Sequence, residues 1–146
     1  MAMLLVDVNP LVYALRSDSP DHRAWLGWLE ACLNGTEHVG LCHLTLAAVV
    51  RIATNSRVFV EPTPLDEVLE FIDVVRSADV VVHLEPGPHH WTLMERLLRA
   101  VGATANQVSD VYLAALALEH DAEVMTADLG FRRYPGLRVR HPLRPV

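Results

Sequence analysis

Lysine is absent from this chain of 146 residues, and all 12 of its basic residues are arginine. P-loop NTPases, receiver domains and haloacid dehalogenase-like phosphatases rely on a lysine near the transferred phosphate, so its absence argues against all three classes. The formal net charge of −6 also argues against charge-driven nucleic-acid binding, which needs a basic face. Any contact with RNA would depend on metal ions or on local arginines.

Cysteines and long apolar runs are scarce as well. Cys32 and Cys42 form neither a CxxC pair nor a disulfide framework, which indicates a reducing compartment and excludes a cysteine-based zinc site. Apolar runs such as LTLAAVV are much shorter than a membrane span, and the first residues do not resemble a signal peptide. We therefore expect a cytoplasmic protein without a membrane partner.

What the sequence does contain is enough apolar mass for a packed core. Hydrophobic residues make up 51% of the chain and charged residues 21%, which argues against disorder. No repeat, linker or low-complexity segment divides it. We expect a single domain over residues 1–146.

Apolar runs of strand length alternate with segments of helical periodicity. Strands are expected at residues 3–7, 38–42, 80–84, 123–128 and 137–141. Helices are expected at residues 10–16, 22–33, 45–54, 65–77, 91–101 and 106–120. This alternation predicts an α/β fold with a central parallel sheet of about five strands and helices on both faces.

Three aspartates interrupt these apolar segments. Asp7 and Asp128 end the first and fourth strands, so both are expected at the sheet edge where ligands bind in such folds. Asp110 lies in the first turn of the helix that leads to the fourth strand. Each has an ordinary structural explanation, as a helix cap, a dipole partner or a turn residue. Together they would repel one another unless a hard cation such as Mg²⁺ or Mn²⁺ offset their charge.

Three segments resemble the PIN-domain ribonucleases, specifically the VapC-type toxins of type II VapBC toxin–antitoxin modules. They are LLVDVNPLVYAL, LAAVVRIATN and the long late segment from Asn106 to Leu143, in which an aspartate opens an alanine-rich helix and a strand ends in Thr-x-Asp. The resemblance implies a PIN-like fold and metal-dependent cleavage of RNA phosphodiester bonds. It also implies a VapB-type antitoxin and a homodimer as partners.

The resemblance assigns roles to individual positions. Asp7 and Asp110 would bind the metal, and Asp128 would complete the acidic pocket. Three polar residues, Asn9, Asn106 and Thr126, would support these carboxylates.

The chain departs from the family pattern at its fourth acid. The family places a glutamate three residues before an arginine, which is Arg51 here, so Ala48 occupies the catalytic position. No acidic residue lies between Glu37 and Glu61 to replace it. Either the alanine was introduced to silence a toxin, or the natural protein is a non-catalytic PIN module that binds RNA or protein. The retention of three other acids favours the first explanation.

The remaining conspicuous side chains have mainly structural interpretations. Trp25 and Trp28 are expected to pack in the core or in a partner groove rather than to stack on bases. The histidines, including His89 and His90, show no metal-binding spacing. Five arginines lie near the end of the chain: Arg132, Arg133, Arg138, Arg140 and Arg144. They could form a solvated face or contact RNA phosphates. Arg132 and Arg133 are nearest to Asp128 in the sequence.

Overall fold

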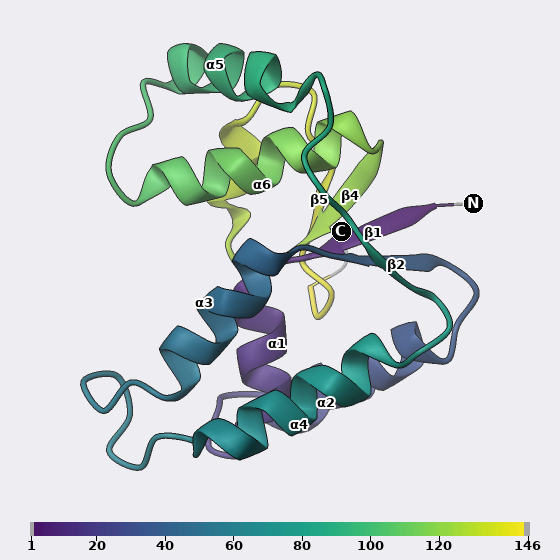
Figure 1. Cartoon of the computed structure of the whole chain (residues 1–146), viewed down its shortest axis with the longest axis vertical. Coiled ribbons are helices and arrows are strands. Elements are labelled where there is room, and N and C mark those ends of the chain that lie inside the picture. The colour runs from purple at the N-terminus through teal and green to yellow at the C-terminus, as the bar shows by residue number, and fades with distance from the viewer. Residues whose placement is uncertain (1, 145–146) are drawn as a thin grey trace.

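The protein is described by a computed structural model over residues 2–144, in which one parallel sheet separates two layers of helices (Figure 1). The expected domain, residues 1–146, also includes Met1, Pro145 and Val146, which lie outside the described residues. The strand order is β3-β2-β1-β4-β5, and every neighbouring pair is parallel. The strands are β1 (Met3–Val6), β2 (His38–Leu41), β3 (Val81–His83), β4 (Ala122–Met125) and β5 (Val139–Arg140). The predicted α/β fold is confirmed.

The helices lie close to their predicted positions, each beginning and ending within about two residues of the expected boundary. They are α1 (Val8–Leu15), α2 (His22–Leu33), α3 (His43–Ala53), α4 (Leu65–Arg76), α5 (His90–Val101) and α6 (Gln107–Glu119). A 3-10 helix, η1 (Leu129–Arg133), was not predicted. Within residues 2–144, no helix is both long and apolar enough to cross a bilayer.

Two apolar cores lie on opposite faces of the sheet, because successive strand side chains point to opposite sides. Val6 of β1 joins the core under α1, α2, α3 and α4, and neighbouring Leu5 joins the core under α5 and α6. Figure 1 shows these two helical layers on either side of the strands. Trp25 is buried in the first core and Trp28 packs against it edge to face, as predicted for a packing pair.

The chain reverses its direction across the sheet at β1. It first moves from β1 to β2 and β3 with helices on one face, then returns past both strands to β4 with α5 and α6 on the other face. The carboxyl ends of β1 and β4 therefore border the point where the connections diverge. In open parallel sheets this is where ligands bind.

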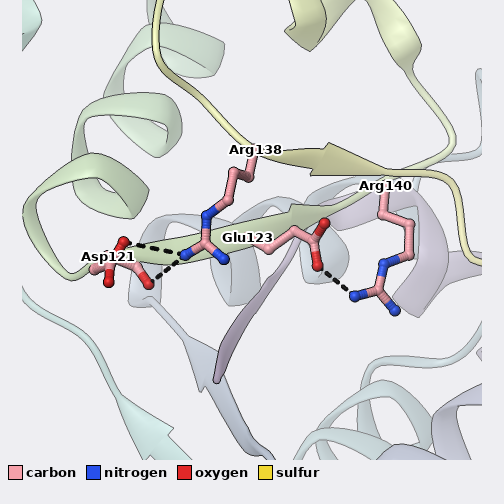
Figure 2. A network of polar contacts seen from close by, with 4 residues as sticks. All are labelled: Asp121, Glu123, Arg138 and Arg140. Atoms are coloured by element: carbon pink, nitrogen blue, oxygen red, sulfur yellow. Dashed lines mark hydrogen bonds and ion pairs between the residues drawn. The ribbon is translucent and has the colours of Figure 1, made fainter. Parts of the chain in front are cut away.

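Two arginines, one just before β5 and one in it, pair with acids just before β4 and in it, as Figure 2 shows. Arg138 donates to the backbone and side-chain oxygens of Asp121, and Arg140 pairs with Glu123. Exposed pairs of this kind contribute only about 0–1 kcal/mol each. They nonetheless engage two of the five late arginines at the sheet edge.

Candidate acidic site

Asp7 is the most deeply buried of the three aspartates, with 8% of its surface exposed. It directly follows β1, and its Oδ1 accepts a hydrogen bond from the Val8 amide at 2.7 Å. This cap starts α1 at Val8, two residues earlier than the Asn9–Pro10 start expected from the sequence. Burial raises the pKa of Asp7, hydrogen bonds from Thr126 and Val8 lower it, and Asp128 raises it, with a net upward shift.

Thr126 connects the carboxyl ends of β1 and β4. Its hydroxyl donates to Asp7 Oδ2 at 2.8 Å and accepts from the Asp128 amide at 2.9 Å. Since Thr126 is fully buried, water cannot replace either bond. The predicted role of Thr126 as a supporting residue for the carboxylates is consistent with these contacts.

Asp128 caps η1 rather than ending a strand. β4 stops at Met125, three residues before the predicted end, and the Asp128 carboxylate accepts from the Gly130 amide at 2.8 Å. Asn9 Oδ1 accepts from the Ala127 amide at 3.1 Å, which ties this loop to α1. Asp128 thus follows β4 through a short, fixed loop.

Asp110 lies in the first turn of α6, as predicted, and is partly buried. Burial, Asp7 and Asp128 together raise its pKa from 3.8 to about 6, against a smaller opposing effect of Arg133. No hydrogen bond to its carboxylate is found among the described residues. Asp110 is therefore the least supported member of the acidic group.

All three aspartates line one cavity of about 840 Å³. Asn9 and Asn106 line it as well. Thr126 does not line it and is joined to the aspartates only through its hydrogen bonds with Asp7 and the Asp128 amide. Helix α3 contributes Ala48, which is partly buried, and Arg51 one turn later. Ala48 therefore faces the same space as the aspartates, with a methyl group where the family pattern has a carboxylate.

The carboxylates match a hard divalent cation in charge, but they do not form a ready-made three-ligand centre. Across residues 2–144, no group of three His, Cys, Asp or Glu side chains is close enough to hold a metal ion. Mg²⁺ commonly binds one or two carboxylates and keeps several waters, so a complete protein cage is not required. Burial chiefly raises the pKa of Asp110, and repulsion from Asp7 and Asp128 adds to it; a bound cation would relieve this repulsion. The oxygen donors and negative charge of the three aspartates would suit such an ion.

Apart from the acids and the polar residues near them, the lining of the cavity is largely apolar and forms an apolar wall. Its main members are Val12, Tyr13, Leu44, Ile52, Val58 and Phe59. Arg16 is 7% exposed, lies 3.5 Å over the Phe59 ring, and donates to Thr63 and Asp18. The loop between α3 and α4 is thereby held against α1. No local pattern signals this contact, because its partners are far apart in the sequence.

Of the two arginines expected near Asp128, only Arg133 is fixed beside the acids. Its Nε donates to the Gly130 carbonyl at 2.8 Å, and its charge lowers the pKa of Asp110. Gly130 permits this arrangement, since a Cβ there would lie 2.8 Å from Asp128 Oδ1 and 2.9 Å from Arg133 Nη2. Arg133 makes no ion pair within residues 2–144. Its charge remains available to a ligand.

The sequence profile of the PIN domain matches residues 4–137. Ribonuclease VapC43 of Mycobacterium tuberculosis (strain H37Rv) is 43% identical over 141 residues, which cover 97% of this chain and 96% of that protein. Ribonuclease VapC37 of the same organism is 36% identical over 140 residues, covering 96% and 97%.

Solved structures share the fold at low sequence identity. VapBC2 from Rickettsia felis, bound to a promoter DNA fragment, gives a TM-score of 0.71 at 17% identity, covering 94% of this chain and 97% of that one. M. tuberculosis VapC20 gives 0.63 at 13%, covering 92% and 98%. With the profile match over most of the sequence and the 43% identical relative, these similarities show that the chain belongs to the PIN-domain family and resembles its VapC-type members.

Proposed function

We propose that this chain is the toxin of a toxin–antitoxin module, a metal-dependent endoribonuclease whose activity is impaired by Ala48. The supporting observation is the placement of Asp7, Asp110 and Asp128 around one cavity at the switch point of the sheet. Relatives named ribonucleases support RNA as the substrate, and the structural neighbour VapC20 is described as a sarcin–ricin loop cleaving toxin. Metal-dependent RNA cleavage after Ala48→Glu tests the proposal as a whole.

Each residue has a distinct task in this proposal. Asp7 and Asp110 would hold Mg²⁺ or Mn²⁺, and Asp128 would add negative charge on the β4 side. When bound, such an ion lowers the pKa of a water and stabilises charge on the phosphate. Thr126 keeps the Asp7 carboxylate fixed through its 2.8 Å hydrogen bond. The methyl group of Ala48 can neither accept a proton nor orient a water, so the attacking water lacks one of its supports.

A non-catalytic PIN module is the second candidate, and Ala48 is the observation that favours it. Such a protein would retain the cavity for binding RNA or protein without cutting. The two candidates differ in one respect: an inactivated nuclease regains cleavage when the carboxylate is restored, whereas a protein adapted to binding does not.

The apolar wall of the cavity suits an antitoxin. Leu44 and Val58 line it and remain 42% and 54% exposed, and the three aspartates line the same cavity. This combination fits an apolar segment that ends in a cationic side chain reaching the acids. Structural neighbours described as VapBC complexes support a VapB-type partner. We propose that this segment binds along α1 and α3 and blocks access of RNA.

Arg133 is expected to bind an RNA phosphate beside the acids. Arg133→Ala should weaken binding of a mixed-sequence single-stranded RNA several-fold and lower the slope of log K against log salt by about 1, because one phosphate contact is lost. Arg132→Ala should have a smaller effect, since Arg132 has no comparable anchor. Filter binding over a salt series measures both, and the chain with Ala48 keeps the RNA intact during the assay.

Arg99→Ala is the matched control for this measurement. Arg99 is exposed on α5, on the opposite face of the sheet from the cavity wall, and should leave the slope unchanged. If Arg133→Ala gives the same slope as Arg99→Ala, the arginines after Asp128 form only a solvated face.

A further inference from the structure

Among the described residues that line the cavity, Arg51 is the one basic side chain. It lies in the last turn of α3, and Ala48 precedes it by one turn on the same face of the helix. The remaining lining residues are the three aspartates and neutral side chains, polar or apolar. One guanidinium therefore shares this cavity with three carboxylates.

The guanidinium of Arg51 has no partner within the protein. The residue is exposed, and its side chain makes no ion pair or hydrogen bond within residues 2–144. Helix α3 offers it no acid, since none occurs between Glu37 and Glu61, and the position of the family's acid is Ala48. Its charge is therefore available to an anion from outside the chain.

The aspartates of the cavity do not neutralise this charge. No nitrogen of Arg51 lies within ion-pairing distance of a carboxylate oxygen among the described residues. The groups that shift the pKa of Asp110 include Arg133 but not Arg51. The next lining residue along α3 is Ile52, which belongs to the apolar wall. The cavity thus presents its carboxylates and its free cation to a ligand as separate groups.

A cation in the last turn of a helix has an ordinary structural role. It interacts favourably with the helix dipole, which contributes about 0.3–1 kcal/mol at an exposed position. This role explains a positive charge near the end of α3. It does not explain why that charge lies in the lining of the cavity, because any exposed position of the last turn would serve the dipole equally well.

We propose that Arg51 is a substrate-binding residue whose guanidinium holds a phosphate of the RNA strand that enters the acidic cavity. This inference rests on the proposed function, because it takes RNA as the ligand of the cavity. The planar guanidinium donates two parallel hydrogen bonds to phosphate oxygens, which a neutral lining residue cannot match. A phosphate that approaches three carboxylates in a chain of net charge −6 needs a compensating cation, and in this lining Arg51 supplies it.

The test is filter binding of a mixed-sequence single-stranded RNA over a salt series in Mg²⁺, in the chain that keeps Ala48. Arg51→Ala should weaken binding several-fold and lower the slope of log K against log salt by about 0.7–1, because one phosphate contact is lost. Arg51→Lys keeps the charge and should keep the slope, although it loses the bidentate geometry and some affinity. Arg96→Ala, an exposed change on α5 outside the cavity lining, should alter neither quantity.

Each result decides between the role of Arg51 and the proposed function. If RNA binds the unmodified chain and Arg51→Ala with equal slopes, Arg51 serves the helix dipole or a protein partner, and its RNA role is wrong while the proposed function stands. An equal loss of slope in Arg51→Lys, or in Arg96→Ala, also overturns the role, because the contact would then depend on neither charge nor position. If the unmodified chain binds no RNA, the proposed function is wrong and the role of Arg51 with it.

Discussion

Ala48→Glu is expected to raise the rate of Mg²⁺- or Mn²⁺-dependent RNA cleavage by about a hundredfold or more, the scale of losing one electrostatic group from an active site. Ala48 lines the cavity with Asp7, Asp110 and Asp128, so a glutamate there adds its carboxylate to theirs. The added group can hold the ion or accept a proton from the attacking water. Cleavage of a labelled RNA, with and without the metal, measures the gain.

Two variants identify the source of any gain. Ala48→Gln has nearly the shape of the glutamate side chain without its charge, and should remain near the activity of the unmodified chain. Adding Asp7→Asn to Ala48→Glu should remove the gain, because Asp7 is required to hold the metal in this account. Equal rates for Ala48→Glu and Ala48→Gln would favour the non-catalytic module instead.

Asp110→Asn should make the metal-free protein more stable at pH 7. Burial, Asp7 and Asp128 raise the pKa of Asp110 from 3.8 to about 6, so the folded state binds more protons than the unfolded state between these values. The free energy of unfolding therefore falls as pH rises from about 4 to about 6. Asparagine does not ionise and avoids this loss, so the free energy of unfolding at pH 7 should be higher by about 1–2 kcal/mol, after discounting for partial exposure of the side chain.

The sign of this effect is best tested over pH. Denaturant unfolding in EDTA should show the advantage of Asp110→Asn at pH 7 and its disappearance below about pH 4, where the aspartate is protonated in both states. Asp73→Asn, an exposed change on α4 outside the cavity, should alter stability little. A destabilised Asp110→Asn at pH 7 would contradict the raised pKa of Asp110 in the folded chain.

The sequence predicted which helices and strands form more accurately than where they begin and end. The predicted start of α1 was wrong because the Asp7 carboxylate caps the helix, so that α1 begins at Val8, before the Asn9–Pro10 signal. The β4 end was wrong because Thr126 turns the chain by binding both Asp7 and the Asp128 amide. In both places a side-chain hydrogen bond, one of them to a residue 119 positions away, overrides the local pattern.

The acidic side of the site was predictable for a topological reason. Strands that run parallel bring their carboxyl ends to one edge, so Asp7 and Asp128 converge whatever the details of packing. The apolar wall depends instead on contacts between distant segments, such as Arg16 with Thr63 and Phe59. Composition and periodicity do not indicate which distant residues come into contact.

Anomalous diffraction from crystals soaked in Mn²⁺ tests the central claim most directly, because it locates the ion without requiring activity. A peak within coordination distance of both Asp7 and Asp110, in the chain carrying Ala48, is the predicted result. It would show that the pocket remains a metal site despite the missing carboxylate. The absence of a peak at saturating Mn²⁺, or a peak that touches neither aspartate, would contradict the account.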